Sequence, residues 1–326
     1  MQHHICINID NNFVPQAAAL MASVYANAKK EAPPVFHVLS NGVSDDNKSI
    51  LKDFAENAGG DIFFHELFDF EERLEKHLNA EPSTGRFPKT VLARIFSAEY
   101  MPADAEKFLY LDADMIVRGD MAELFNEDIK GFVIGACAEP TIYEGLETDQ
   151  GGYKGYFNAG MFLCDRNAWI SGDYTGRALK WYCENNGRFD FADQDILNNV
   201  LSGKVKFLSQ KWNFMSNYHY RSFDSLVRRA PWYGRLQEKT DYEASRKNPE
   251  IVHFAGDERP WYQGSKNPYR EEYEKYLSMT PYRDVEPVKG KERYMAFYHA
   301  VNVLSEKIPG FRAFASRVFY RIKKRK

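Results

Sequence analysis

The sequence lacks the motifs that mark several large classes of enzymes. It has no Gly-x-Gly-x-x-Gly segment and no Walker sequence, so dinucleotide-binding and P-loop functions have no support. It also has no plausible Gly-x-Ser-x-Gly turn and no His-Glu-x-x-His helix, which leaves serine-hydrolase and zinc-protease chemistry without support. Internal repeats are absent as well. With 44% apolar residues, the 326-residue chain can bury one large core or two modest ones.

Cysteine is scarce, and the few cysteines present form no recognisable pattern. Cys6, Cys137, Cys164 and Cys183 contain no Cys-x-x-Cys pair and no zinc-binding spacing. Three of them lie in strongly apolar neighbourhoods, where a small buried thiol is expected. A reducing cytosol is therefore the simplest compartment for this protein.

Long apolar runs are missing too. The N-terminus has no basic segment followed by an apolar run, so no signal peptide is visible. No apolar stretch reaches the roughly 18 residues that a spanning helix needs. We therefore expect a cytoplasmic protein, unless something holds it to a membrane surface.

The chain has no overall excess of basic residues, but its charge is unevenly distributed. Lys and Arg number 43 against 46 Asp and Glu, a net charge of −3, which argues against a dedicated nucleic-acid-binding protein. From Lys291 to the end there are ten basic residues and two acidic ones, a net charge of +8. Residues 1–290 therefore carry −11, so an acidic body precedes a basic tail.

Short apolar runs alternate with helical patterns over the first 140 residues. Strands are expected at 5–9, 35–39, 62–64 and 108–111, with helices near 15–28, 44–54 and 89–101. This alternation predicts an α/β fold with a mainly parallel central sheet that helices flank on both faces. Further strands are expected at 132–138, 157–164, 205–208 and 251–254, with helices near 167–184 and 193–202, and an irregular connector over 266–290. Ligands of such sheets gather at the carboxyl ends of the strands.

Two carboxylates, Asp112 and Asp114, directly follow the strand expected at 108–111. Clustered carboxylate oxygens suit a hard cation, and magnesium or manganese would bridge them to a phosphate. The alternative is that they cap a turn, as most Asp residues after strands do. His253 ends the last expected strand at the same sheet end, where an imidazole would favour manganese over magnesium. A lone histidine beside apolar residues is otherwise more often part of the core.

The segment Asp10-Asn11-Asn12 follows the first expected strand and opens a helix. Asp and Asn are good helix caps, which is the simpler interpretation. The functional alternative is that these side chains form hydrogen bonds to a nucleoside at the same edge of the sheet.

Five short motifs, taken together, resemble glycosyltransferase family 8. They are Asp10-Asn11-Asn12, Tyr110-Leu111-Asp112-Ala113-Asp114, Phe157-Asn158-Ala159-Gly160, Asp193-Gln194-Asp195 and His253-Phe254-Ala255-Gly256. Their order and spacing are similar to those of bacterial lipopolysaccharide α-galactosyl- and α-glucosyltransferases. The resemblance covers about residues 3–265 and implies a nucleotide-sugar-binding catalytic domain of the GT-A type over 1–265.

The resemblance implies a role for each matching residue. Asp112 and Asp114 would hold Mn²⁺, or Mg²⁺, with His253 as the third protein ligand, and the metal would bridge both phosphates of UDP. The other implied contacts to the UDP-hexose donor are Asp10, Asn12, Phe13, Arg94, Asp112, Ala113, Asn158 and Gly256.

The resemblance also places Gln194 beneath the anomeric carbon, in a family that retains the anomeric configuration of the donor. An amide lacks the charge of a carboxylate and is a poor nucleophile. This favours front-face substitution, in which the UDP phosphate helps to deprotonate the acceptor. Asp193 would bind the sugar hydroxyls, while Asp195 is either a second candidate nucleophile or a supporting residue.

Arg259 departs from the family pattern, because a Lys usually follows the His-x-x-Gly segment. Arginine keeps the positive charge and binds phosphate in a bidentate manner, so pyrophosphate binding is still expected here. Asp257 and Glu258 add negative charge next to this phosphate contact.

The tail, residues 291–326, contains two helical patterns around Pro309-Gly310. Aromatic and aliphatic residues share one side of each pattern, and basic residues occupy the rest, which is typical of a helix that lies on an anionic membrane surface. The alternative is a helical hairpin packed on the body or a contact in a dimer. Nucleic acid is not expected as a partner, since the body has no extended basic face.

Together these observations predict a retaining, manganese-dependent glycosyltransferase that moves galactose or glucose from a UDP-sugar to a glycan or glycolipid acceptor. Its predicted location is the cytoplasmic face of the inner membrane, with the tail as a peripheral anchor, and lipopolysaccharide or another surface glycan as its product. One alternative is a protein or soluble sugar as the acceptor. Another is a non-catalytic nucleotide-sugar-binding protein, which the intact set of Asp112, Asp114, His253 and Gln194 disfavours.

Overall fold

A seven-stranded sheet forms the centre of the computed structural model, which describes residues 2–29, 33–67, 89–141, 155–185, 191–308 and 311. The strands are β1 His4–Asp10, β2 Val35–Asn41, β3 Asp61–Glu66, β4 Lys107–Leu111, β6 Ile134–Ala138, β7 Phe157–Asp165 and β8 Val205–Leu208. Their order is β3-β2-β1-β4-β7-β6-β8. Within this sheet, only β7 runs against its neighbours among the described strands, so the predicted mainly parallel sheet is confirmed in a mixed form.

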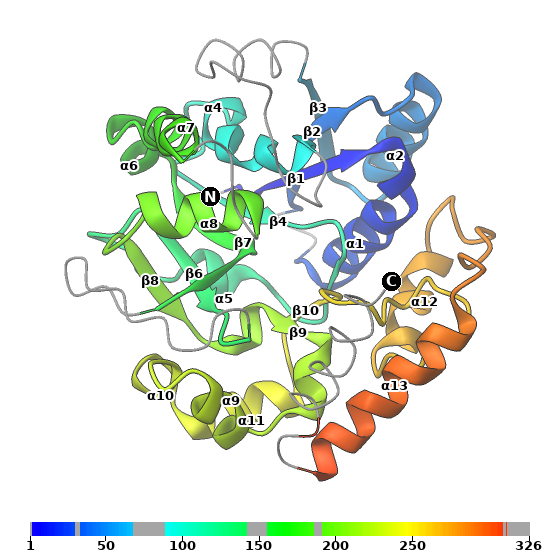
Figure 1. Ribbon diagram of the computed structural model, residues 1–326. Helices are drawn as coiled ribbons and strands as arrows, with labels where there is room; N and C mark the ends of the chain where they lie inside the picture. The colour runs from blue at the N-terminus through cyan, green and yellow to red at the C-terminus, as the bar shows by residue number, and fades with distance from the viewer. Residues whose placement is uncertain are drawn as a thin grey trace.

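Helices cover both faces of this sheet (Figure 1). On one face lie α1 Val14–Asn27 and α2 Asp45–Asn57. On the other lie the 3₁₀ helix η2 Lys89–Phe96 and the helices α4 Ser97–Tyr100, α6 Arg166–Ser171, α7 Tyr174–Glu184 and α8 Ala192–Val200. Leu109 and Leu111 of β4 face the first layer, whereas Phe108 and Tyr110 face the second. Because alternate residues of a strand point to opposite faces, a strand covered on both sides is apolar throughout.

A second, three-stranded sheet corrects one expectation from the sequence. It has the order β5-β10-β9 and consists of β5 Met115–Val117, β9 Phe214–Met215 and β10 Ile251–His253. Both edges of β4 are already occupied by β1 and β7, so β10 cannot join the main sheet beside it. It pairs instead with β5, which begins directly after Asp114, and this places His253 opposite Met115.

The remaining elements contain most of the buried tyrosines. They are η1 Asn11–Phe13, α5 Ala122–Phe125, η3 Gln210–Trp212, η4 Ser216–Tyr220, α9 Phe223–Arg229, α10 Tyr233–Leu236, α11 Lys239–Lys247, α12 Arg270–Ser278 and α13 Glu292–Lys307. Most of these elements, though not α5, pack around this second sheet. The stretch 266–290 is not wholly irregular as predicted, because α12 lies within it and buries Tyr273 and Tyr276. The helix expected at 89–101 is largely 3₁₀.

The first helix of the basic tail is confirmed as α13, whereas the second predicted helix lies outside the described residues apart from Phe311. Among the described helices, none combines the length and apolar character that a membrane span requires. Cys6, Cys137 and Cys164 are buried and unpaired, as their apolar surroundings predicted.

Three histidines form a continuous row across β1, β2 and β3. The His4 Nδ1 lies 3.0 Å from the His37 Nε2, and the His37 Nδ1 lies 3.1 Å from the His65 Nε2. Burial, together with the neighbouring His65 and His4, lowers the pKa of His37 to about 3. Burial also lowers the pKa values of His4 and His65. The row is therefore neutral near pH 7, and protonation of it is disfavoured in the folded state.

We predict that this row makes the fold sensitive to acid. A histidine whose pKa is lower in the folded state than in the unfolded state favours unfolding once it begins to bind a proton. Above its unfolded pKa it has no effect on stability, and the free energy of unfolding decreases as the pH falls from about 6.5 toward 3. His37→Phe keeps a ring of similar size but cannot bind a proton. Between pH 7 and pH 5 the free energy of unfolding should therefore decrease by about 1–2 kcal/mol less in the variant than in the unmodified protein. Urea unfolding at the two pH values measures this difference. An unchanged difference between variant and unmodified protein would contradict the assignment.

Candidate active site

The polar residues singled out by the sequence meet at one edge of the main sheet. The strand order reverses between β1 and β4, so their connections diverge and leave a crevice at the carboxyl ends, where ligands bind in such folds. A cavity of about 440 Å³ lies there. Nine predicted site residues line it, namely Arg94, Asp112, Asp114, Asn158, Asp193, Gln194, His253, Gly256 and Arg259.

Asp112, Asp114 and His253 form a compact group that could hold a metal ion. One ligand atom from each lies within 4.8 Å of those of the other two. The His253 Nε2 is 3.2 Å from an Asp114 oxygen and 3.9 Å from an Asp112 oxygen. Burial opposes ionisation of Asp114, but His253 and then Arg259 hold its pKa well below the usual range. The donor set is thus two carboxylates and one imidazole, which suits a cation such as Mn²⁺.

Asn213, which sequence analysis missed, sets the orientation of His253. The Asn213 Nδ2 donates to the Asn158 Oδ1 at 2.9 Å, so its Oδ1 faces the His253 Nδ1 at 3.0 Å and can only accept. The His253 Nδ1 therefore carries a proton, and Nε2 is the ring nitrogen that faces the two carboxylates. Partners of this kind fix the ring and tautomer of metal-binding histidines. The residues present therefore fit a divalent cation.

The reversed direction of β7 explains how Asn158 and Gly160 reach this edge. Because β7 is antiparallel to β4, its first residues lie beside the end of β4, and the Asp112 amide donates to the Gly160 carbonyl at 2.7 Å. A Cβ at position 160 would lie 2.5 Å from the His253 Cε1 and 2.7 Å from the Asp112 Oδ2. Only glycine allows these two side chains to approach each other here.

Arg94 joins two of the carboxylates. Its guanidinium lies 2.9 Å from Asp112 and 2.6 Å from Asp193, and it donates to the Ala159 carbonyl at 2.7 Å. Burial raises the pKa of Asp193 to about 6; Arg94 opposes this increase, while Asp112 and Asp195 add to it. Asp193 is therefore a carboxylate whose charge depends on its contact with Arg94.

Gln194 and Asp195 share the hydroxyl of Tyr156, another residue that the sequence did not single out. The Gln194 Oε1 accepts from the Ala159 amide at 3.0 Å, and its Nε2 donates to the Tyr156 hydroxyl at 3.2 Å. That hydroxyl donates to Asp195 at 2.6 Å, and the Phe191 amide donates to the other Asp195 oxygen at 3.0 Å. Gln194 thus lines the cavity in a fixed position, while Asp195 supports the start of α8.

Four predicted donor contacts do not line this cavity. Asp10 caps η1, where its Oδ1 accepts from the amides of Asn12 and Phe13 at 2.9 and 3.1 Å. Phe13 lies edge-on to Trp261, with 6.2 Å between the ring centres. Ala113 is buried between the two metal-group carboxylates. Asp10 therefore has the capping contacts that were its simpler interpretation, although it lies at the carboxyl end of β1, beside the crevice.

Arg259 points from the loop after β10 toward the metal group. Its Nη2 lies 3.4 Å from the Asp114 Oδ2, and its guanidinium lies 5.4 Å from the centre of the Trp261 ring. Gly256 turns the loop with a φ of +106°, a backbone conformation that favours glycine. Arg259 therefore belongs to the cavity, as its place in the sequence predicted.

Glu139 is a carboxylate in the cavity that the sequence analysis did not select. It follows β6 and is buried, and it accepts hydrogen bonds from the Thr141 amide at 2.8 Å and the Tyr218 hydroxyl at 3.0 Å. Burial raises its pKa, while the contacts with Thr141 and Tyr218 oppose this increase. The pattern that identified Asp112 could also have identified Glu139, because both are carboxylates directly after a buried strand.

We predict that Gly160→Ala disrupts the metal group while the protein still folds. The new methyl group would displace His253 or Asp112, and the affinity for Mn²⁺ should fall at least tenfold, about the loss seen when supporting residues of metal sites are changed. Titration calorimetry with Mn²⁺ measures the affinity. Gly135→Ala in β6 is the control, since its methyl group would meet only Ile129 and Leu208. Equal Mn²⁺ affinity of both variants would contradict the proposed geometry.

Comparisons with known proteins agree with this arrangement. Residues 4–264 match the family described as "Glycosyl transferase family 8". General stress protein A of Bacillus subtilis (strain 168) is 27% identical over 290 residues, which cover 86% of this chain and 95% of that protein. The lipopolysaccharide 1,3-galactosyltransferase of Salmonella typhimurium is 25% identical over 92% of this chain and 86% of its own.

A solved structure has the same fold. The galactosyltransferase LgtC in complex with donor and acceptor sugar analogues has a TM-score of 0.67 and 23% identity, covering 90% of this chain and 99% of its own. The family match spans both sheets and all residues of the metal group. The chain therefore belongs to glycosyltransferase family 8.

Proposed function

We propose that this protein is a retaining hexosyltransferase that moves galactose or glucose from UDP to a glycan acceptor with the help of Mn²⁺. The observation that carries the proposal is the group of Asp112, Asp114 and His253, with the His253 Nε2 facing both carboxylates. It opens on the same cavity as Arg94, Asp193 and Gln194. A divalent cation held there would supply positive charge to the two phosphates of the leaving nucleotide.

Different residues of the chain would bind different parts of the UDP-sugar donor. Arg259, on the far side of Asp114 from His253, is placed to bind the pyrophosphate with its planar fork of donors. Asn158 and Asp193 would bind hydroxyls of the sugar, and Arg94 keeps Asp193 oriented toward the cavity. Asp10, Asn12 and Phe13, at the end of β1, would contact the nucleoside.

The hydrogen bonds of Gln194 support a front-face substitution. Its amide is held at both ends, by Ala159 and Tyr156, so it cannot rotate to present a different atom without losing a contact. An amide oxygen in this position can stabilise positive charge that develops at the anomeric carbon. Asp195 is already bonded to Tyr156 and Phe191, which supports its role as a positioning residue rather than a nucleophile.

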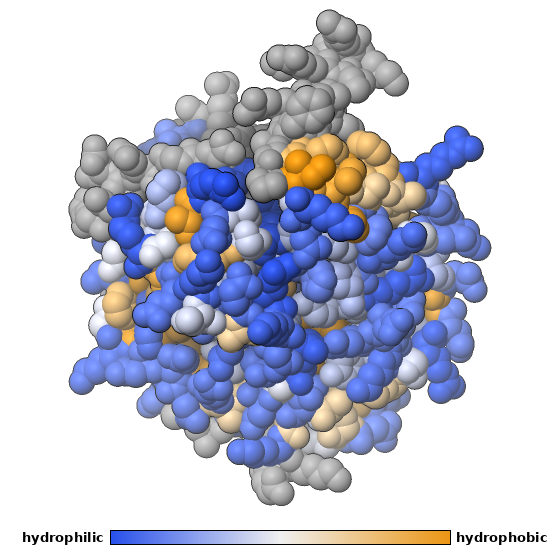
Figure 2. Space-filling view, turned by 90° about the horizontal axis from the view of Figure 1, so that it is seen from below, coloured by the Kyte–Doolittle hydropathy of each residue, from blue (hydrophilic) through white to orange (hydrophobic). Residues whose placement is uncertain are grey.

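The relatives support a lipid-linked glycan as the acceptor. Two of them are named lipopolysaccharide 1,3-galactosyltransferase and lipopolysaccharide 1,2-glucosyltransferase, and both act on a membrane glycolipid by name. The exposed face of α13 supports a membrane location. Phe297 and Leu304 are exposed there, as is Ile308 directly after the helix, and Figure 2 shows the hydrophobic patch over α13 on a largely hydrophilic side of the molecule. The basic residues of the tail follow directly in the sequence.

The catalytic proposal is tested by the release of UDP from a panel of UDP-sugars, with Mn²⁺ and with a chelator. We expect turnover of UDP-galactose or UDP-glucose that the chelator abolishes. Asp112→Asn should abolish Mn²⁺-dependent binding of UDP, because one metal oxygen and its charge are lost. Asp53→Asn, an exposed site on α2, serves as the control and should bind UDP normally. No turnover of any donor under either condition would overturn the proposal.

The membrane location is tested on the exposed face of α13. Phe297→Glu combined with Leu304→Glu should weaken binding to vesicles that contain anionic phospholipid at least about tenfold, because two apolar side chains no longer enter the interface. Met279→Glu, an exposed apolar residue at the end of α12, is the control. Co-sedimentation with the vesicles measures the binding. Equal binding by all three proteins would show that α13 is not the anchor.

A further inference from the structure

The loop of residues 254–259 joins the proposed metal ligand His253 to Arg259, and it carries two additional carboxylates. Asp257 and Glu258 stand directly before Arg259, where their negative charge would oppose the binding of a phosphate. Both carboxylates contact polar side chains of α13, an element about 40 residues further along the chain. The tail helix α13 therefore contacts the 254–259 loop through Asp257 and Glu258, the two carboxylates whose negative charge would oppose phosphate binding.

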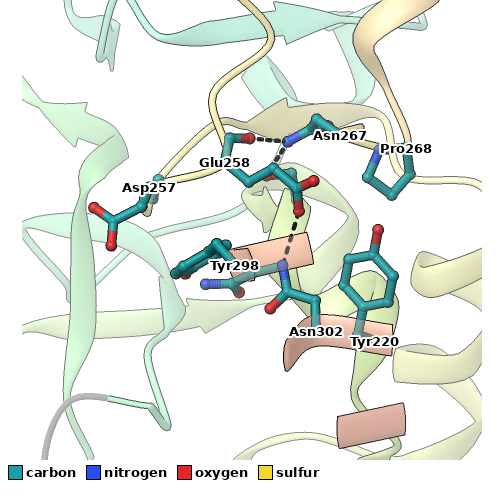
Figure 3. Close-up of a pocket in the computed structure, with 10 residues that line it drawn as sticks. Tyr220, Asp257, Glu258, Asn267, Pro268, Tyr298 and Asn302 are labelled. Carbon is teal, nitrogen blue, oxygen red and sulfur yellow. Dashed lines mark hydrogen bonds between the residues drawn. The ribbon is translucent and has the colours of Figure 1, made fainter. Parts of the chain in front are cut away.

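Glu258 is the centre of this contact. It is only 6% exposed, and its carboxylate lies 2.9 Å from the His299 Nδ1 and accepts from the Asn302 Nδ2 at 2.8 Å. The amide of Lys266 also donates to it at 3.2 Å. Figure 3 shows the Asn302 amide directed at the Glu258 carboxylate, while Asn267 contacts the Glu258 backbone. Both the main chain and the side chain of residue 258 are thus fixed.

Two further contacts hold the loop from the same helix. The Tyr294 hydroxyl donates to Asp257 at 2.8 Å. The Tyr298 hydroxyl lies 3.5 Å from the place where a Cβ on Gly256 would be. Tyr298 and Asn302 line a small pocket together with Asn217 and Asp257, which also line the large cavity. The 254–259 loop therefore lies between the donor cavity and α13.

These contacts keep the Glu258 carboxylate out of the donor cavity. The Glu258 side chain is turned toward α13, while Arg259 reaches Asp114 and stays over Trp261. Released from His299 and Asn302, a carboxylate at position 258 would be one residue from Arg259 and would pair with it readily. Such a pair would compete with a phosphate for the guanidinium.

We infer that α13 is part of the donor site, and that His299 and Asn302 act through Glu258 as positioning residues for the 254–259 loop. The inference rests on the proposed function, since it assumes that this loop binds the nucleotide phosphates. It assigns to the tail helix a role in donor binding that is separate from its exposed apolar face.

The experiment reverses the direction of one hydrogen bond. Asn302→Asp places two carboxylates face to face, whereas after Glu258→Gln the Asn302 amide can turn over so that its oxygen accepts from the new amide. Combining both substitutions restores a complementary pair, because the new amide at position 258 can donate to the new carboxylate at position 302 and still accept from His299 and Lys266. We expect Asn302→Asp to bind UDP in the presence of Mn²⁺ about tenfold or more weakly, the usual range for losing a hydrogen bond to a charged group, and Glu258→Gln to show a smaller loss. The double variant should return to within about threefold.

Two readouts separate positioning from general stability. Titration calorimetry, below the melting temperature of each variant, gives the affinity for UDP, and steady-state kinetics should show a raised KM for the donor with little change in kcat. Hydrogen exchange of the amides at 254–259 should speed up in Asn302→Asp and slow again in the double variant. Phe297→Ala, on the exposed face of α13, is the control and should change neither readout.

The outcomes distinguish this inference from the proposed function. If the unmodified protein does not bind UDP with Mn²⁺, the proposed function fails, and loop exchange alone then decides whether α13 holds the loop. If it binds UDP but Asn302→Asp binds equally well, the inference is overturned. It is also overturned if the double variant binds UDP no better than Asn302→Asp, because the effect is then a loss of packing rather than of charge placement.

Discussion

The buried guanidinium of Arg94 is the interaction on which the site depends. It contacts Asp112 after β4, Asp193 at the start of α8 and the carbonyl of Ala159 in β7, so one side chain joins three separate parts of the chain. A buried carboxylate without a cation is costly, and two of them would be left if this residue were removed. Burial opposes the charge of Arg94, but the two acids outweigh it and raise the pKa of the guanidinium, so it stays charged. A planar fork holds both carboxylates in a fixed geometry, whereas a lysine is a point charge on a flexible stem.

Arg94 does not balance the charge of the cavity. Asp112, Asp114, Asp193, Asp257 and Glu139 line it, against Arg94 and Arg259 as permanent cations. The excess of negative charge suits a divalent cation and, with it, the phosphates of a nucleotide. It also explains why a further carboxylate beside this cavity needs partners of its own. Glu258 finds them in His299 and Asn302 of α13, and it does not line the cavity.

Local patterns in the sequence were sufficient for the strands of the main sheet and for β10, though not for β5 and β9, and they were sufficient for most of the residues that line the cavity. Asp112 and Asp114 could be identified because a buried run followed by carboxylates is visible within seven residues of sequence, from 108 to 114. Asn213 could not, since its contact with His253 joins residues 40 positions apart and no local pattern marks it. The position of β10 escaped for a similar reason, because the pairing partner of a strand depends on which edges are already occupied. Tyr273 and Tyr276 in α12, three positions apart, were a signal for a helix in the stretch predicted as irregular.

The tail shows most clearly what composition can and cannot reveal. Its charge and aromatic content favoured a membrane surface, and packing on the body was kept as the alternative. In α13 both interpretations can hold, because one face of the helix packs on the body and another face is exposed. His299 and Asn302 face the body and bind Glu258, whereas Phe297 and Leu304 are exposed. A helix with 3.6 residues per turn presents both faces along its whole length. If the exposed face rests on a membrane as proposed, the surface that carries the acceptor also supports the helix that holds the donor loop.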